Sequence, residues 1–129
     1  MKNIKVLFVD DEEEFVQLLA ERARLQELGS EIALDGSEAL AKLGEKLPDV
    51  MILDFQLAGI DGLTVLEQVK KEYPDVEVIM LTARGNPEIE KKARERGAFD
   101  YLEKPVDFNK LKRIIEKAYQ HKQTLGNGK

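Results

Sequence analysis

Five short runs rich in apolar and β-branched residues alternate with helix-period stretches along this 129-residue chain. The runs span residues 4–9, 31–34, 50–53, 76–81 and 98–102. In the stretches between them apolar residues recur at spacings of three and four, as at Phe15, Leu18 and Leu19, which is typical of amphipathic helices. Because strands joined through helices run parallel, the pattern predicts an α/β fold of the (βα)5 type. We expect a doubly wound five-stranded parallel sheet in three α/β/α layers.

Turn-forming and capping residues divide the chain into the same elements. Gly29 and Gly97 are expected to end helices, since glycine readily adopts the conformation that closes a helix. Side chains that accept hydrogen bonds from a first helical turn are expected at Ser37, Asn86 and Asp107. The second and fifth runs carry Glu31 and Asp100 and are therefore expected at the two edges of the sheet.

Composition and charge narrow the class of protein. The sequence predicts one domain over residues 1–122 and a flexible tail over 123–129. It contains no cysteine, which excludes disulfides and thiolate-bound metals. No apolar run approaches the roughly 20 residues of a membrane span or forms a signal peptide, so we expect a cytoplasmic protein without a membrane partner. A net charge of −5 argues against direct nucleic-acid binding by this domain.

Polar side chains follow four of the predicted strands at their carboxyl ends: Asp10, Asp11, Asp54, Thr82 and Lys104. Because parallel strands end at one edge of a sheet, we expect these side chains to converge where α/β sheets bind ligands. Crowded carboxylates repel one another, and a site made only of oxygen ligands suits Mg²⁺. With an ammonium and a hydroxyl beside them, these are the groups needed to form and hold an aspartyl phosphate.

Four stretches resemble a known family: "VLFVDDE", "DVMILDFQLAGIDGL", "VIMLTA" and "GAFDYLEKPVD". In this order and spacing they are similar to the receiver (phospho-acceptor) domain of bacterial two-component response regulators, over roughly residues 4–120. The resemblance implies a flavodoxin-like fold with strand order 2-1-3-4-5. The last stretch is similar to receivers found ahead of transcriptional activator ATPases.

The resemblance also implies a role for each site residue. Asp54 becomes the phosphorylated residue, and Thr82 and Lys104 become contacts of its phosphoryl group. The implied Mg²⁺ ligands are Asp10, Asp11, Asp54 and the backbone carbonyl of Gln56. Glu12, Glu13 and Glu14 are left to begin the first helix, where acidic side chains meet the positive end of the helix dipole.

Further positions match switch and tuning residues of the family. Tyr101 corresponds to an aromatic residue that turns inward when Thr82 moves. Ala83 leaves room for the phosphoryl group, and the implied tuning positions are Gln56, Ala83 and Arg84. The Lys104–Pro105 peptide is expected to be cis. Ala58 stands where the family usually has proline, which predicts a more flexible loop after Asp54.

The implied function is a phosphorylation-activated signalling switch. A sensor histidine kinase donates the phosphoryl group, and the surface formed by the helix at 86–97, the strand at 98–102 and the last helix changes. A downstream effector domain or protein, or a second copy of this chain, then binds that surface. The domain is not expected to be a turnover enzyme, because it catalyses only its own Mg²⁺-dependent phosphoryl transfer and dephosphorylation.

Three other functions stay open at this point. A phosphatase of the haloacid-dehalogenase type needs a second acid two residues after the nucleophile, where this chain has Gln56. A nucleotide or flavin binder needs a glycine- or hydroxyl-rich loop after the first strand, where this chain has acids. An interaction module that does not switch would not need the full acidic site. His121 is expected to be a solvated surface residue and not a phosphorelay histidine.

Overall fold

The computed structural model describes residues 3–57 and 59–127, with side-chain burial described through residue 124. Strands and helices alternate from the first element to the last. In order they are β1 (Lys5–Val9), α1 (Glu13–Leu25), β2 (Gly29–Ala33), α2 (Gly36–Glu45), β3 (Val50–Leu53), α3 (Gly62–Glu72), β4 (Glu77–Thr82), α4 (Pro87–Glu95), β5 (Asp100–Glu103) and α5 (Phe108–Asn127). The alternation predicted from the sequence is confirmed.

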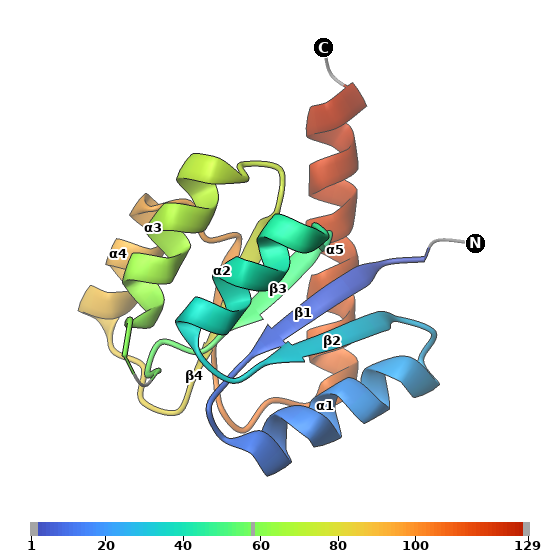
Figure 1. Cartoon of the computed structure of the whole chain (residues 1–129), viewed down its shortest axis with the longest axis horizontal. Coiled ribbons are helices and arrows are strands. Elements are labelled where there is room, and N and C mark those ends of the chain that lie inside the picture. The colour runs from blue at the N-terminus through green and yellow to red at the C-terminus, as the bar shows by residue number, and fades with distance from the viewer. Residues whose placement is uncertain (1–2, 58, 128–129) are drawn as a thin grey trace.

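The five strands form one parallel sheet in the order β2-β1-β3-β4-β5 (Figure 1). This confirms the expected strand order and places β2 and β5 at the two edges. The register pairs Val9 with both Ala33 and Leu53, Leu53 with Met80, and Thr82 with Glu103. Residues that follow different strands in the sequence are therefore brought to the same edge of the sheet.

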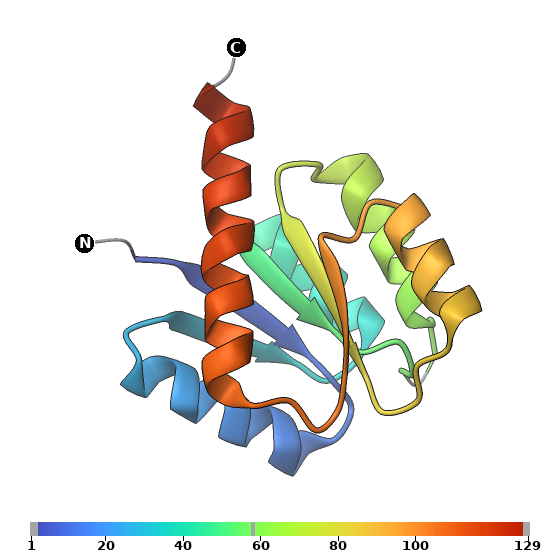
Figure 2. The same ribbon diagram turned by 180° about the vertical axis from the view of Figure 1, so that it is seen from behind.

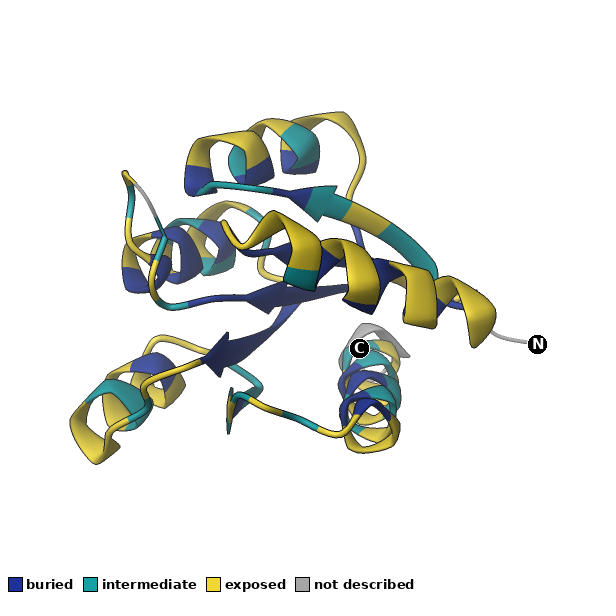
Figure 3. Cartoon of the chain, turned by 90° about the horizontal axis from the view of Figure 1, so that it is seen from below, coloured by how far each residue is buried: buried dark blue, intermediate teal, exposed yellow. Residues whose placement is uncertain are grey.

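Helices cover both faces of the sheet, with α1 and α5 on one face and α2, α3 and α4 on the other (Figures 1 and 2). Successive residues of a strand point to opposite faces. Phe8 accordingly packs with α1 and α5 residues such as Val16 and Leu111, whereas Leu7 packs with Leu43 and Leu66 of α2 and α3. The exposed sides of the helices face away from the sheet (Figure 3). The central strands are buried on both faces, as near-continuous apolar runs require.

Three helix ends follow the expected chemistry. Asn86 Oδ1 accepts a hydrogen bond from Ile89 N at 2.8 Å, and Asp107 Oδ2 accepts one from Lys110 N at 3.3 Å. Gly97 has a φ of 103°, a conformation that favours glycine. α4 and α5 therefore begin at side-chain caps, and α4 ends just before a glycine.

Two expected boundaries are wrong. α1 ends at Leu25, and the positive φ of 65° falls on Glu27, which leaves Gly29 free to begin β2. At the start of α2 the cap is Asp35 and not Ser37, because Asp35 Oδ1 accepts from Glu38 N at 2.7 Å. The second error arises because two suitable capping residues stand close together in the sequence, whereas the first arises because a residue other than glycine adopts the positive φ.

The last helix is longer than expected. α5 continues to Asn127, so it covers residues 123–127 of the expected tail. Residues 108–125 contain no proline or glycine, and extending an existing helix costs little. His121 is exposed at the surface, as expected, and its Nδ1 atom also contacts a carboxylate oxygen of Glu77, whose side chain is 6% exposed. Flexibility at the end of the chain stays a prediction.

Within the part of the chain that the structure describes, none of the helices is long and apolar enough to cross a membrane.

Candidate functional site

The acidic site lies where β1 and β3 end. Asp54 N donates a hydrogen bond to Val9 O at 3.0 Å, and Asp10 N donates one to Ala33 O at 3.1 Å. Sheet pairing therefore continues one residue beyond each strand and fixes both backbones. Asp10 is 4% exposed and Asp54 is 5% exposed. Two buried carboxylates are thus held at the carboxyl edge of the sheet.

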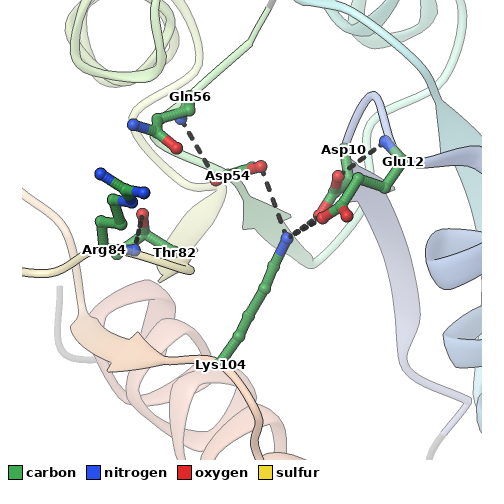
Figure 4. Close-up of polar contacts among 7 residues, drawn as sticks. All are labelled: Asp10, Glu12, Asp54, Gln56, Thr82, Arg84 and Lys104. Carbon is green, nitrogen blue, oxygen red and sulfur yellow. Dashed lines mark hydrogen bonds and ion pairs between the residues drawn. The ribbon is translucent and has the colours of Figure 1, made fainter.

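Lys104 reaches the same edge from the segment after β5 (Figure 4). Its Nζ atom lies 2.6 Å from Asp10 Oδ2, 2.9 Å from Glu12 Oε1 and 3.5 Å from Asp54 Oδ2. The ammonium also lies 4.4 Å from the centre of the Phe15 ring, a cation–π contact. Lys104 therefore offsets the charge of three acids at once.

Burial and a neighbouring negative charge raise the pKa of Asp54, the expected phospho-acceptor. Burial and the neighbouring Asp10 carboxylate raise the pKa of Asp54 to about 6, against the opposing effects of the Gln56 amide and Lys104. Burial lowers the pKa of the Lys104 ammonium, but its hydrogen bonds to Asp10 and Glu12 outweigh this and leave its pKa raised. At neutral pH the site therefore holds an ionised Asp54 whose charge is only partly compensated.

The acidic residues fit a divalent cation. Asp10, Glu12 and Asp54 each offer a carboxylate oxygen, and these oxygens lie within 4.8 Å of one another. Carboxylates are the ligands that Mg²⁺ prefers, together with water and phosphate oxygens. A cation here would relieve the repulsion that raises the pKa of Asp54. The donor set therefore supports the expected Mg²⁺ site.

Glu12, and not Asp11, lies with the other two acids in the structure. The Asp11 side chain is exposed, and its carboxylate is not part of the three-acid group. Glu12 N donates to Asp10 Oδ1 at 2.9 Å, and the Glu12 backbone is extended. In extended backbone, side chains two residues apart point to the same side. This alternation was the sequence signal that could have placed Glu12 beside Asp10. The expected role of Asp11 as a metal ligand stays a prediction.

The backbone around Asp54 is packed against the start of α3. Asp54 Oδ1 accepts a hydrogen bond from Gln56 N at 3.1 Å. Gly62 N donates to Phe55 O at 2.9 Å, and a Cβ atom at position 62 would lie 2.4 Å from Asp54 O. Only glycine permits this approach. From the sequence Gly62 is a turn residue, and its contact with Asp54 depends on tertiary structure.

Thr82 ends β4 on the other side of Asp54 from Asp10 (Figure 4). Thr82 is fully buried, and its Oγ1 atom accepts a hydrogen bond from Arg84 N at 3.3 Å. A hydroxyl that accepts this bond can still donate its own proton to a second group. Ala83 and Arg84 are exposed beside the site. The tuning roles of Gln56, Ala83 and Arg84 stay predictions.

Tyr101 is 8% exposed and belongs to the core beneath α4. Burial raises the pKa of its hydroxyl, and the Asn86 amide opposes this effect. The Lys104–Pro105 peptide bond is cis. Ala58, expected to loosen the loop after Asp54, lies outside the described residues.

Comparison with known proteins identifies the family. The model of the response regulator receiver domain matches residues 6–116. The putative response regulator NtrX-like of Rickettsia felis is 38% identical over 120 residues, which are 92% of this chain and 25% of that protein. The DNA-binding transcriptional regulator NtrC of Salmonella typhimurium is 40% identical over 89 residues, which are 69% of this chain and 19% of that protein. The chain thus spans a quarter or less of the length of these two relatives.

Solved structures agree with the sequence match. The receiver domain of NtrX from Brucella abortus superposes with a TM-score of 0.84 at 34% identity, covering 89% of this chain and 98% of that one. A CheY-like receiver domain protein from Methanospirillum hungatei superposes with a TM-score of 0.91 at 24% identity, covering 95% and 98%, and it supports the fold alone. The chain belongs to the response regulator receiver domain family.

Proposed function

We propose that this receiver domain accepts a phosphoryl group on Asp54 from a histidine kinase, with Mg²⁺, and that the modification changes the α4–β5–α5 surface. The observation that carries the proposal is the setting of Asp54. It is buried, its pKa is raised to about 6, and Lys104 Nζ lies 3.5 Å from its Oδ2 atom. Such a carboxylate is ionised at neutral pH and only partly neutralised, as a nucleophile must be.

The reaction would be an in-line displacement at phosphorus. An Asp54 carboxylate oxygen forms the new P–O bond, and the P–N bond of a phosphohistidine whose second ring nitrogen is protonated breaks. The leaving nitrogen keeps the electron pair, and because the other nitrogen holds a proton the ring leaves as neutral imidazole. The expected ligands Asp10, Asp11, Asp54 and the Gln56 carbonyl would hold Mg²⁺, with the Glu12 carboxylate beside them. When bound, the ion would supply positive charge to the phosphoryl oxygens. Lys104 then turns from the shared acids toward the phosphoryl group, and Thr82 donates its hydroxyl proton to a phosphoryl oxygen.

The output would be a change in the surface that partners bind. α4 buries only Ala93 fully among its nine residues, so few contacts hold it in place. Thr82 is joined through the β4–α4 loop to this helix and pairs in register with Glu103 of β5. Movement of Thr82 toward a phosphoryl group therefore acts first on α4 and β5. The relatives support an output domain of a transcriptional regulator as the partner.

Amide hydrogen exchange tests the switching part of the proposal. Beryllofluoride with Mg²⁺ mimics the phosphorylated aspartate, and we expect altered exchange in α4, β5 and the start of α5. Asp54→Ala serves as the control, because it cannot bind the mimic. Identical exchange with and without beryllofluoride in the wild-type protein would contradict switching and would favour an interaction module that does not respond to phosphorylation.

A further inference from the structure

The loop between β4 and α4 lies close against two residues of β5. Gly85 N donates a hydrogen bond to Glu103 Oε2 at 3.3 Å. A Cβ atom at position 85 would lie 2.9 Å from Tyr101 Oη and 2.9 Å from both Cγ and Cδ of Glu103. Carbon atoms in favourable contact lie about 3.5–4.0 Å apart. A side chain at position 85 would therefore require the ends of the Tyr101 and Glu103 side chains to shift.

The same loop connects the phosphorylation site to α4. Arg84 N donates to the Thr82 hydroxyl oxygen at 3.3 Å, and Asn86 Oδ1 accepts from Ile89 N at 2.8 Å. Three consecutive residues are thus joined to three different places: the site, β5 and the first turn of α4. Gly85 stands in the middle of this series.

Tyr101 lacks the hydrogen bond that would explain its inward position. Its ring is buried, and no described residue forms a hydrogen bond with its Oη atom. Burial raises the pKa of this hydroxyl. The nearby Asn86 amide lowers it without meeting the geometry of a hydrogen bond, and the Glu103 and Glu90 carboxylates raise it further. A buried polar group without a partner favours a conformation in which it reaches water. Packing of the ring in the core opposes an outward turn, and a contact at its hydroxyl end would add to that effect.

We propose that Gly85 and Glu103 form a latch that holds Tyr101 inward before any phosphoryl group is present. The latch consists of the hydrogen bond from Gly85 N to Glu103 Oε2 and the close approach of the Gly85 backbone to the Tyr101 hydroxyl. It sets the balance between the two positions of Tyr101, and Arg84 connects it to Thr82. Its consequence for signalling rests on the proposed function, whereas the latch itself acts in the unphosphorylated protein.

Fluorine NMR tests the latch without a phosphodonor. The full chain is labelled with 3-fluorotyrosine, its three tyrosine signals are assigned by Tyr→Phe variants, and a soluble paramagnetic probe is added. In the wild-type protein we expect the Tyr101 signal to be protected relative to those of the half-buried Tyr73 and Tyr119. In Gly85→Ala the new methyl group displaces the ring, so its broadening should rise to the level of those two signals.

Gly44→Ala is the matched control. Gly44 lies in α2, and its added Cβ would meet only Tyr73 Oη, at an ordinary 3.9 Å. This variant should alter at most the Tyr73 signal and leave Tyr101 protected. A folded Gly85→Ala protein whose Tyr101 signal stays as protected as in wild type would overturn the proposal.

Glu103→Ala is the second variant, and it decides the matter even where Gly85→Ala does not fold. It removes the hydrogen-bond acceptor but leaves the glycine, so we expect Tyr101 broadening between the wild-type and half-buried levels. Unchanged protection in Glu103→Ala would refute the latch whatever Gly85→Ala shows. Failure of Asp54 to accept a phosphoryl group would refute the proposed function and leave the NMR result standing.

Discussion

Asp54 shows how the position of one residue sets its chemistry. The residue follows a strand that is buried on both faces, and its carboxylate stands beside Asp10 at the same edge of the sheet. Burial and the second carboxylate both disfavour its charge. The protein therefore keeps a charged group where folding alone would favour a neutral one. Such perturbed groups are concentrated at functional sites.

Replacing that charge should stabilise the metal-free protein. The pKa of Asp54 is about 6 in the folded protein, against an ordinary 3.8. The folded state therefore holds the Asp54 proton more tightly than the unfolded state does. The stability that this proton contributes is fully present below pH 3.8 and is lost as pH rises through 6. Asp54→Asn avoids this loss, so its unfolding free energy at pH 8 without Mg²⁺ should exceed that of wild type by on the order of 1–3 kcal/mol. Urea unfolding at pH 8 and pH 4 measures the difference, which should nearly vanish at pH 4. A less stable Asp54→Asn protein at pH 8 would contradict the account.

Gly62 supports the site through its backbone, and a side chain there should disturb Asp54. A Cβ atom would lie 2.4 Å from Asp54 O and 2.7 Å from Phe55 Cα. Gly62→Ala should therefore destabilise the protein by about 1–3 kcal/mol, as overpacking does. Gly44→Ala, exposed in α2, should instead stabilise it by about 0.5–1 kcal/mol. Thermal unfolding of both variants checks the contrast, and equal effects would refute the proposed role of Gly62.

For single residues, the sequence predicts which ones lie at the carboxyl edge of the sheet but not the direction in which each side chain points. Asp10, Asp54, Thr82 and Lys104 were expected at the edge because strand ends meet there, and the structure places them at it. The choice between Asp11 and Glu12 depends on how the backbone turns after β1, and apolar periodicity contains no information about that turn. The close approach of Gly62 to Asp54 likewise requires knowledge of where α3 packs.

The start of α2 illustrates the same limit for an element. Asp35 and Ser37 are both good capping residues, and the structure uses Asp35. Glu38 decides between them, because its Oε1 atom accepts a hydrogen bond from Leu34 N at 2.6 Å while its own amide donates to Asp35. The arrangement is similar to a capping box, except that the Glu38 side chain accepts from the amide of Leu34, one residue before the cap, and not from that of Asp35. An acid three residues after Asp35 was the available signal.

The cap makes a direct prediction for α2. Asp35→Ala removes the acceptor of the Glu38 amide and should lower the free energy of unfolding by about 1 kcal/mol. Ser37→Ala lies inside the helix and should change it by a few tenths of a kcal/mol at most. Chemical denaturation of the two variants gives the comparison. A larger loss for Ser37→Ala would show that the assigned cap is wrong.

α5 makes contacts that no local pattern could reveal. Glu77 begins β4 and is buried, and it lies between His121 of α5 and Lys70 of α3, whose Nζ atom is 3.9 Å away. One carboxylate thus joins helices from opposite faces of the sheet. The pairing depends on where α5 crosses the sheet and on its continuation past residue 120. Its residues are 44 positions apart in sequence. Polarity correctly predicted that His121 is exposed, but it could not reveal this contact.

For the whole molecule, alternating strands and helices were sufficient to predict the architecture. Parallel strands, short connections and right-handed crossovers leave few arrangements. The order β2-β1-β3-β4-β5 came from the resemblance and is confirmed. Element ends were less predictable, because α1 and β2 are divided by a positive φ at Glu27, a residue type that seldom adopts it. The whole fold matters to function because it brings Asp10 and Lys104, 94 positions apart, into contact.

Phosphoryl transfer to the isolated protein tests the central claim most directly. The wild-type protein and Asp54→Ala are incubated with acetyl phosphate, with Mg²⁺ or with a chelator, and their intact masses are compared. The account predicts that wild type gains the mass of one phosphoryl group only with Mg²⁺, and that Asp54→Ala gains none under either condition. An unchanged wild-type mass with Mg²⁺, or equal labelling of Asp54→Ala, would contradict it.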